Sequence, residues 1–253
     1  MKQQHMLRYF ISVLFLFGCV AGQSQSKSID LQPKDTVVKK ESYGLRVGVD
    51  LSRLALSFFN EDYTGLELVG DYRLTQKLFL AAELGNEDRT KQEDLYNFNS
   101  SGSYIKAGVD YNTYQNWDGM DNTIFLGGRY AVSTFSQTLN DYSVFDSNRY
   151  WNTGDFADGQ SPGQEFSGLN ASWIELIFGA KVELFANIYL GASVRLGYLV
   201  TQKQAEQFPT LWIPGFNKVT DGSKFGAGYN YSISYFIPLY KKVKKPTKKK
   251  IEN

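Results

Sequence analysis

Cysteine and histidine are almost absent from this sequence of 253 residues, in which each occurs once, as Cys19 and His5. Both lie within the first nineteen residues. If processing removes that segment, the mature chain has no thiol for a disulfide or a nucleophile. It also has no imidazole for a catalytic triad, a usual zinc site or a pH switch. We therefore predict that the protein is not an enzyme, and that it has no catalytic residue and no cofactor.

Long apolar runs are also missing, apart from Tyr9–Val20. This run of twelve residues is too short to cross a bilayer as a helix. It follows a short basic segment and precedes small residues, which is the pattern of a secretory signal peptide over residues 1–22. Leu16–Cys19 also resembles a lipoprotein signal, in which Cys19 would carry a lipid anchor, and this alternative stays open.

The C-terminal end differs in charge from the body of the chain. Residues 241–253 carry seven Lys and one Glu, whereas the net charge of the whole chain is only +1, so the remainder is mildly acidic. We expect a flexible leader over 23–42, one domain over 43–240 and a Lys-rich tail over 241–253. The tail lacks a nucleic-acid-binding motif, so no nucleic acid is expected. It is either solvated or in contact with an anionic surface.

Apolar and polar residues alternate strictly in two consecutive segments. Every second residue from Ile174 to Leu184 is apolar or small, and after a short break the pattern resumes from Ile188 to Leu196. A period of two predicts a strand, a turn and a strand. The other face of both strands mixes charges of both signs with glycines. This composition suits a crowded barrel interior, with the apolar face turned to an apolar solvent.

The same alternation recurs along the chain and predicts about eight strands. The connections between them run long, short, long, medium, long, short, long, with 86–102 and 133–170 among the long loops. Short turns on one side and long loops on the other are typical of outer-membrane barrels. The expected fold is all-β: a single antiparallel up-and-down transmembrane β-barrel. The expected strands are 43–51, 65–73, 78–85, 105–111, 124–131, 174–184, 188–196 and 225–235.

The inner face of this barrel is predicted to be charged. An eight-stranded barrel is just wide enough for its side chains to fill it, so buried charges must pair. Together with Lys224, seven basic residues oppose seven acidic ones on this face. We therefore assign ion pairing, and not acid–base catalysis, to these carboxylates. The predicted lumen charge network consists of Arg46, Asp50, Glu67, Asp71, Arg73, Glu83, Lys106, Asp110, Arg129, Glu175, Lys181, Glu183 and Arg195.

Two of the expected long loops are rich in aromatic residues. Tyr150, Trp151 and Phe156 lie in the first, and Trp212 and Phe216 lie in the loop before the last strand. Exposed rings of this kind form a possible contact surface for a sugar or a protein partner. The alternative is that the rings pack on one another and cap the mouth of the barrel.

Two segments rich in Asp and Gly, 118–122 and 155–159, invite comparison with calcium sites. Neither has the full spacing of the ligands in a calcium-binding loop. Asp and Asn beside Gly are common in turns. We therefore expect no metal site.

Four stretches carry a resemblance to a known family: YGLRVGVDLSRL, LELVGDYRLTQKLFLAAELG, FSGLNASWIELIFGAK and IPGFNKVTDGSKFGAGYNYSISYFIPLYKK. They resemble a Gram-negative family of outer-membrane β-barrel proteins that is described only as a domain of unknown function. The resemblance covers about residues 43–242. It implies the cell outer membrane as the location and outer-membrane lipid as a partner. It supplies no catalytic or binding residues.

These features together predict an integral outer-membrane barrel with a structural or recognition role through its long outer loops. A small channel or transport component is the first alternative, and it requires a water path through the lumen. A lipid-anchored periplasmic barrel that holds a ligand as lipocalins do is the second. The second alternative requires four apolar residues to face the cavity instead of lipid: Leu176, Phe178, Val182 and Leu190.

Overall fold

The computed structural model describes residues 40–93, 96–114, 121–145, 156–158, 163–185, 187–204, 208–219 and 223–243. The expected signal peptide, most of the expected leader, the possible lipid site at Cys19 and most of the Lys-rich tail lie outside the described residues. So do residues 118–120 of the first Asp- and Gly-rich segment, residues 155 and 159 of the second, and the loop residues Tyr150 and Trp151.

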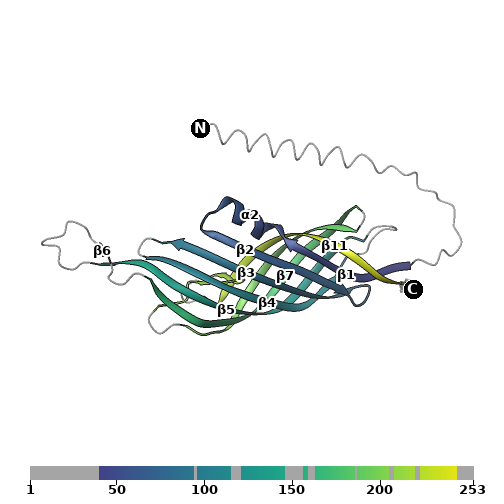
Figure 1. Cartoon of the computed structure of the whole chain (residues 1–253). Helices are drawn as coiled ribbons and strands as arrows, with labels where there is room; N and C mark the ends of the chain where they lie inside the picture. The colour runs from purple at the N-terminus through teal and green to yellow at the C-terminus, as the bar shows by residue number, and fades with distance from the viewer. Residues whose placement is uncertain are drawn as a thin grey trace. The chain divides into compact units, whose positions relative to one another are not determined.

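Eight antiparallel strands close into a ring, which confirms the predicted up-and-down barrel (Figure 1). Each strand pairs with its neighbours in the chain, and pairing of the first strand with the last closes the ring. The first strand begins at Lys40, inside the expected leader, and the last ends at Val243, inside the expected tail. The strands are β1 (Lys40–Asp50), β2 (Tyr63–Arg73), β3 (Leu78–Gln92), β4 (Tyr96–Asn112), β5 (Thr123–Phe145), β7 (Gln164–Phe185), β8 (Ile188–Gln202) and β11 (Phe225–Val243).

Four shorter elements lie in the connections. Strand β6 (Phe156–Asp158) pairs with the end of β5, and β9 (Trp212–Ile213) pairs with β10 (Asn217–Lys218) in a small hairpin. Helix α2 (Leu51–Phe59) follows β1 directly. Over the part of the chain that the structure describes, no helix is long and apolar enough to cross a membrane.

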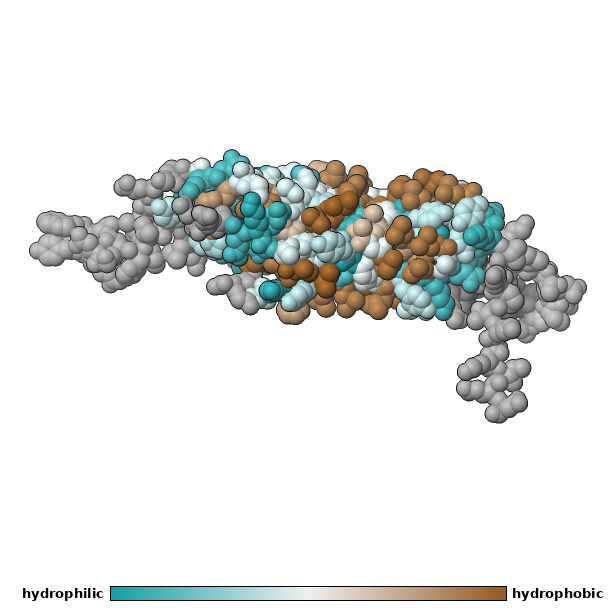
Figure 2. All heavy atoms as spheres, turned by 90° about the horizontal axis from the view of Figure 1, so that it is seen from below, coloured by the Kyte–Doolittle hydropathy of each residue, from teal (hydrophilic) through white to brown (hydrophobic). Residues whose placement is uncertain are grey.

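Side chains of the barrel strands alternate between the two faces as the sequence predicts. On β7, Leu176 and Phe178 point outward and are 54% and 61% exposed, whereas Glu175 and Ile177 are buried inside. We call the outward apolar surface the apolar belt, and Figure 2 shows it over the middle of the barrel, with hydrophilic side chains toward the ends. The apolar belt includes Leu45, Val47, Leu66, Leu68, Leu80, Leu84, Ile105, Val109, Leu126, Val132, Leu176, Phe178, Leu190, Val194, Leu196, Tyr229 and Ile233.

The two segments expected to be long loops are largely strands. β3 and β4 together cover most of 86–102, and β5 and β7 cover 133–145 and 164–170. The prediction was wrong because it relied on apolar residues at outward positions, and here those positions are polar. The inward positions still alternate, as the buried rings of Phe98 and Phe135 show.

Candidate functional site

Lys106 lies at the centre of a charged layer that crosses the barrel. Its Nζ atom is 3.1 Å from Glu175 and 3.8 Å from both Glu67 and Glu83. The guanidinium of Arg195 also contacts these three carboxylates. The five side chains come from β2, β3, β4, β7 and β8, so the layer ties together strands on different sides of the wall.

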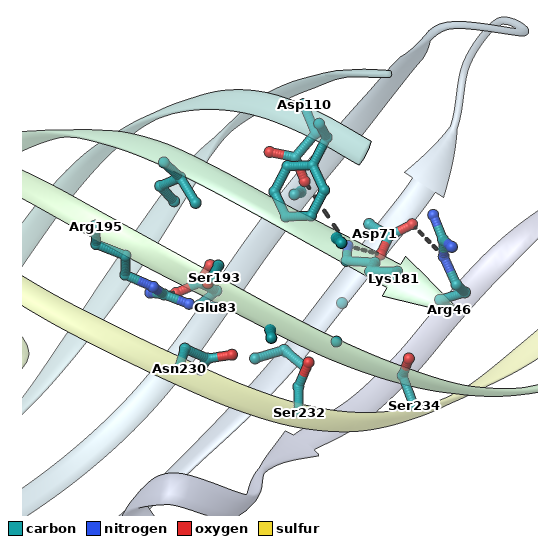
Figure 3. Close-up of a pocket in the computed structure, with 18 of the residues that line it drawn as sticks. Arg46, Asp71, Glu83, Asp110, Lys181, Ser193, Arg195, Asn230, Ser232 and Ser234 are labelled. Atoms are coloured by element: carbon teal, nitrogen blue, oxygen red, sulfur yellow. Dashed lines mark hydrogen bonds and ion pairs between the residues drawn. The ribbon is translucent and has the colours of Figure 1, made fainter. Parts of the chain in front are cut away.

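A second charged layer lies nearer the chain termini. Asp71 accepts hydrogen bonds from Arg46 Nε at 2.8 Å and from Lys181 Nζ at 2.6 Å. Lys181 Nζ is also 3.8 Å from Asp110, and Asp110 lies 2.7 Å from Arg129. Arg46, Asp71, Lys181 and Asp110 point toward one another (Figure 3) and come from β1, β2, β7 and β4. Arg129 also lies 3.5 Å from Glu83, so the two layers form one continuous network.

The space between the layers is small and is lined by both polar and apolar side chains. It encloses about 490 Å³ of space between atoms, part of it open to solvent. Ser193, Ser232, Ser234 and Asn230 line it beside the charged side chains (Figure 3). Among the described residues, no group of three or more His, Cys, Asp or Glu is arranged to hold a metal ion.

The physical effect of the network is to neutralise charge inside a narrow lumen. A buried ion without a partner costs several kcal/mol, and well-placed counter-ions offset that cost. Each carboxylate at the centre of the two layers has at least one cation within 4 Å. The arrangement therefore fills and stiffens the barrel.

The membership of the charge network differs from the sequence prediction at four residues. Lys224 is exposed, and the half-buried Glu183 accepts a hydrogen bond from the backbone N–H of Asn187 instead of forming an ion pair within the layers. Arg53 and Glu87, which the sequence did not indicate, lie inside the barrel and pair with each other at 2.6 Å. Asp50 lies 3.9 Å from the Arg53 Nε atom and completes this end of the network.

Aromatic rings and arginines close the barrel near the chain termini. The guanidinium of Arg46 lies 5.0 Å from the ring centres of Phe79 and Tyr189. Arg73 lies over the rings of Tyr43 and Phe79, and it pairs with Glu41 and Asp121 near this end. Cations over ring faces are attracted electrostatically, most strongly where water is excluded.

The hairpin of β9 and β10 folds into the opposite mouth of the barrel. Trp212 and Phe216 are only 6% and 4% exposed, so their expected role in an exposed contact surface is wrong. Phe216 packs edge-on against Trp173, and Ile213 lies fully buried beside them. We call residues 212–218 the plug.

Glu87 fixes the plug by polar contacts. Its carboxylate accepts hydrogen bonds from the indole N–H of Trp212 at 3.1 Å and from the backbone N–H of Gly215 at 2.9 Å. Ser100 donates its hydroxyl to the Trp212 carbonyl at 3.0 Å. Gly215 has a φ of +84°, and a Cβ atom there would lie 2.6 Å from the ring of Tyr104. The turn therefore requires glycine.

The other expected contact residues cannot be placed on a surface. Tyr150 and Trp151 lie outside the described residues, and Phe156 is described only through its backbone in β6. The contact surface suggested by these three residues therefore stays a prediction.

The fold defines the chain as an eight-stranded antiparallel β-barrel of the transmembrane type. A model of the family "Domain of unknown function (DUF6048)" matches residues 6–242, so the chain belongs to this family. No curated protein matches the chain.

The chain is similar at low identity to several solved structures, among them the following three. Neisserial surface protein A is 10% identical, with 78% of this chain and 98% of that chain covered and a TM-score of 0.40. Ail, the attachment invasion locus protein of Yersinia pestis, is 8% identical, with coverage of 77% and 97% and a TM-score of 0.39. Acinetobacter baumannii CarO2 is 12% identical, with coverage of 79% and 100% and a TM-score of 0.36.

Proposed function

We propose that this chain is an integral outer-membrane protein with a structural or recognition role, and that recognition uses the strands that extend beyond the apolar belt. The observation that carries the proposal is an abrupt change of chemistry along paired strands. Leu84, Ile105 and Val132 form one row across β3, β4 and β5. Two residues further along, the row consists of Asn86, Ser103 and Thr134.

An apolar outward belt supports the membrane part of the proposal. Transmembrane barrels present an outward apolar band about 25 Å tall to lipid. In water, the same surface would leave many large apolar side chains exposed in one continuous patch, which is unusual for a soluble protein. Inside the barrel, paired charges occupy the two layers, and the buried apolar cluster lies around the plug.

The polar rows beyond the apolar belt form a second surface, which we call the projecting face. β5 alone continues for 13 residues after Val132. Side chains on the projecting face bond across strands: Asn86 donates to Ser103 at 3.0 Å and Asn99 donates to Asp88 at 2.8 Å. Its hydroxyls and amides, without Lys or Arg, suit a polar partner outside the cell. The projecting face consists of Asn86, Asp88, Thr90, Asn97, Asn99, Ser101, Ser103, Thr134, Ser136 and Thr138.

The alternatives fit the geometry less well. A channel needs a continuous water path, whereas the plug occupies one mouth and the rings of Phe79 and Tyr189 narrow the other. A lipocalin-like barrel needs an apolar cavity, whereas Leu176 and Phe178 lie on the outside and charged groups line the inside. Both observations favour a closed structural barrel.

Membrane fractionation tests the location. We expect recovery of the protein in the outer membrane after carbonate washing, with a gel band that migrates differently before and after boiling. Recovery as soluble or carbonate-released protein would overturn the proposal.

Cysteine labelling of intact cells tests the role of the projecting face. In a Cys19→Ser background, Ser101→Cys should react with a membrane-impermeant maleimide added outside the cells. Thr75→Cys, in the short turn between β2 and β3, is the matched control and should react only after the cells are lysed. If Thr75→Cys reacts in intact cells and Ser101→Cys is protected, the barrel has the opposite orientation and the proposed recognition role is wrong.

A further inference from the structure

The barrel wall has a gap beside β1. β1 pairs with β2 only over Leu45–Val49, and its pairing with β11 stops at Asp50. β2 begins at Tyr63 and β11 begins at Phe225, so both strands continue beyond the end of β1. The first residues of β2 and of β11 therefore have no pairing with β1 along the edge that faces the gap.

Helix α2 lies in this gap and packs against both β2 and β11. The chain turns into the helix at Asp50, whose carboxylate accepts a hydrogen bond from the backbone N–H of Ser52 at 2.7 Å. This is ordinary N-cap chemistry, since it satisfies one of the free N–H groups of the first turn. Figure 1 shows α2 beside β2 at the point where β1 ends.

The side of α2 that faces the barrel is polar and makes hydrogen bonds and an ion pair with the barrel strands. Ser57 Oγ accepts from the backbone N–H of Gly65 at 2.8 Å and lies 3.3 Å from the Gly65 carbonyl, so it occupies the open edge of β2. Arg53 reaches into the lumen, where it donates to Tyr63 at 2.9 Å and pairs with Glu87. These contacts fix which side of the helix faces outward.

The outward side of α2 is apolar. Phe58 and Phe59 are 85% and 90% exposed, the highest values among the large apolar side chains of the described residues. Leu66 on β2 and Tyr229 on β11 flank the helix, and both belong to the apolar belt. Tyr229 pairs with Val194, another residue of the belt. The outer face of α2 is therefore continuous with the surface that we propose to be in lipid.

A polar pocket lies on the inner side of the helix. It holds about 340 Å³ of space between atoms, part of it open to solvent, and Arg53, Glu67, Asn230 and Tyr229 are among its lining residues. Gly226, Ala227 and Gly228 also line the pocket, so it lies along the edge of β11 that has no pairing with β1. Backbone groups at such an edge cannot be left open to lipid, because each unsatisfied group costs several kcal/mol there.

We propose that α2 is a membrane-embedded section of the barrel wall, and that lipid acyl chains cover Phe58 and Phe59 in the half of the bilayer farther from the chain termini. The helix separates the charged lumen from the hydrocarbon where β2 and β11 have no pairing with β1. This inference rests on the proposed membrane location, because acyl chains reach α2 only if the apolar belt is in a bilayer.

Site-directed spin labelling tests the proposal in the whole barrel. Phe58→Cys and Phe59→Cys, made in the Cys19→Ser background, are labelled with a nitroxide and refolded into phosphatidylcholine vesicles. We expect both labels to collide several-fold more often with oxygen, which dissolves in lipid, than with a water-soluble nickel complex. Leu176→Cys on the belt is the lipid control, and Ser101→Cys on the projecting face is the water control.

The controls separate failure of this inference from failure of the proposed location. If the Leu176→Cys label reports lipid and the α2 labels report water, the helix lies outside the bilayer and the inference is wrong. Immobilised α2 labels shielded from both agents would also overturn it, because they would show a protein surface or a second copy covering the helix. If the Leu176→Cys label itself reports water, the proposed membrane location fails. A heat-modifiable gel band for every variant shows that each barrel is folded.

Discussion

The side-chain nitrogen of Lys106 lies 3.1 Å from a carboxylate oxygen of Glu175, with both side chains buried inside the barrel. Lys106 is on β4 and Glu175 is on β7, and β5 lies between those strands in the sheet. The ion pair therefore joins two strands that are separated by one strand in the sheet, and it restrains the curvature of the wall there. Glu175 also accepts a hydrogen bond from the indole N–H of Trp173 at 2.7 Å, which connects the network to the apolar cluster around the plug.

Replacing Lys106 with methionine should destabilise the folded barrel by about 3 to 5 kcal/mol, because the carboxylates around it would lose a buried counter-ion. The double variant Lys106→Met with Glu175→Gln should lose less than the sum of the two single variants, because the removed charges interact directly. Urea-induced unfolding from vesicles, followed by tryptophan fluorescence, measures these differences.

Lys91→Met is the matched control for this experiment. Lys91 pairs with Glu93 at the same separation of 3.1 Å, but both side chains are partly exposed. The hydrogen bond and the charge of Lys91 lower the pKa of Glu93. An exposed pair of this kind contributes about 0 to 1 kcal/mol, so the control should change stability little. Equal losses of stability from Lys106→Met and Lys91→Met would contradict the prediction, because the lumen ion pairs would then behave like exposed ones.

The barrel and most of its lumen charges could be predicted because strand alternation is a local property. Every second residue faces one side, so the outward apolar positions alone place residues such as Arg46 and Lys181 inside. The rule failed where outward positions became polar, as at Asn86 and Asp88, and the strand there was predicted to be a loop. Glu87 lies between these two residues, so its inward position was missed for the same reason.

Arg53 and the plug depend on contacts between distant parts of the chain. Arg53 is on a short helix, and its direction follows from the gap in the wall beside β1. Trp212 and Phe216 fold inward because Glu87, Tyr104 and Trp173 receive them, and these partners are far away in the sequence. A local pattern of aromatic residues beside Pro and Gly could not distinguish an exposed surface from an inward plug.

Two glycine substitutions should separate backbone strain from crowding at the plug. Gly215 and Gly163 share a φ of +84°, so alanine at either position costs about 1 to 2 kcal/mol in a left-handed conformation. A Cβ atom at Gly215 would also meet the Tyr104 ring at 2.6 Å, whereas nothing lies within 4 Å at Gly163.

We therefore expect Gly215→Ala to cost about 1 to 3 kcal/mol more than Gly163→Ala, the usual range for overpacking. The same unfolding assay provides the comparison, and near-ultraviolet circular dichroism reports the rings around the plug. Equal costs, with unchanged dichroism, would mean that the turn at Gly215 is not pressed against Tyr104.

An arginine placed on the apolar belt should be costly only if the belt is in lipid. Phe178→Arg should destabilise the barrel in vesicles by about 2 to 4 kcal/mol, as expected for a charge near the bilayer midplane. Thr138→Arg on the projecting face is the control and should change stability by less than about 0.5 kcal/mol. Tolerance of arginine at both positions would argue that water, and not lipid, surrounds the belt.

The plug should keep the lumen closed to ions. Ile213 is fully buried, and Ile→Ala substitutions in well-packed sites cost about 2 to 5 kcal/mol, so Ile213→Ala combined with Phe216→Ala should loosen the hairpin. In planar bilayers we expect no steady conductance from the unaltered protein and intermittent openings from the double variant. Leu211, next to the plug and half-buried, offers the control Leu211→Ala, which should stay silent. Steady conductance from the unaltered protein would favour the channel alternative, because the plug would then leave a continuous water path beside it.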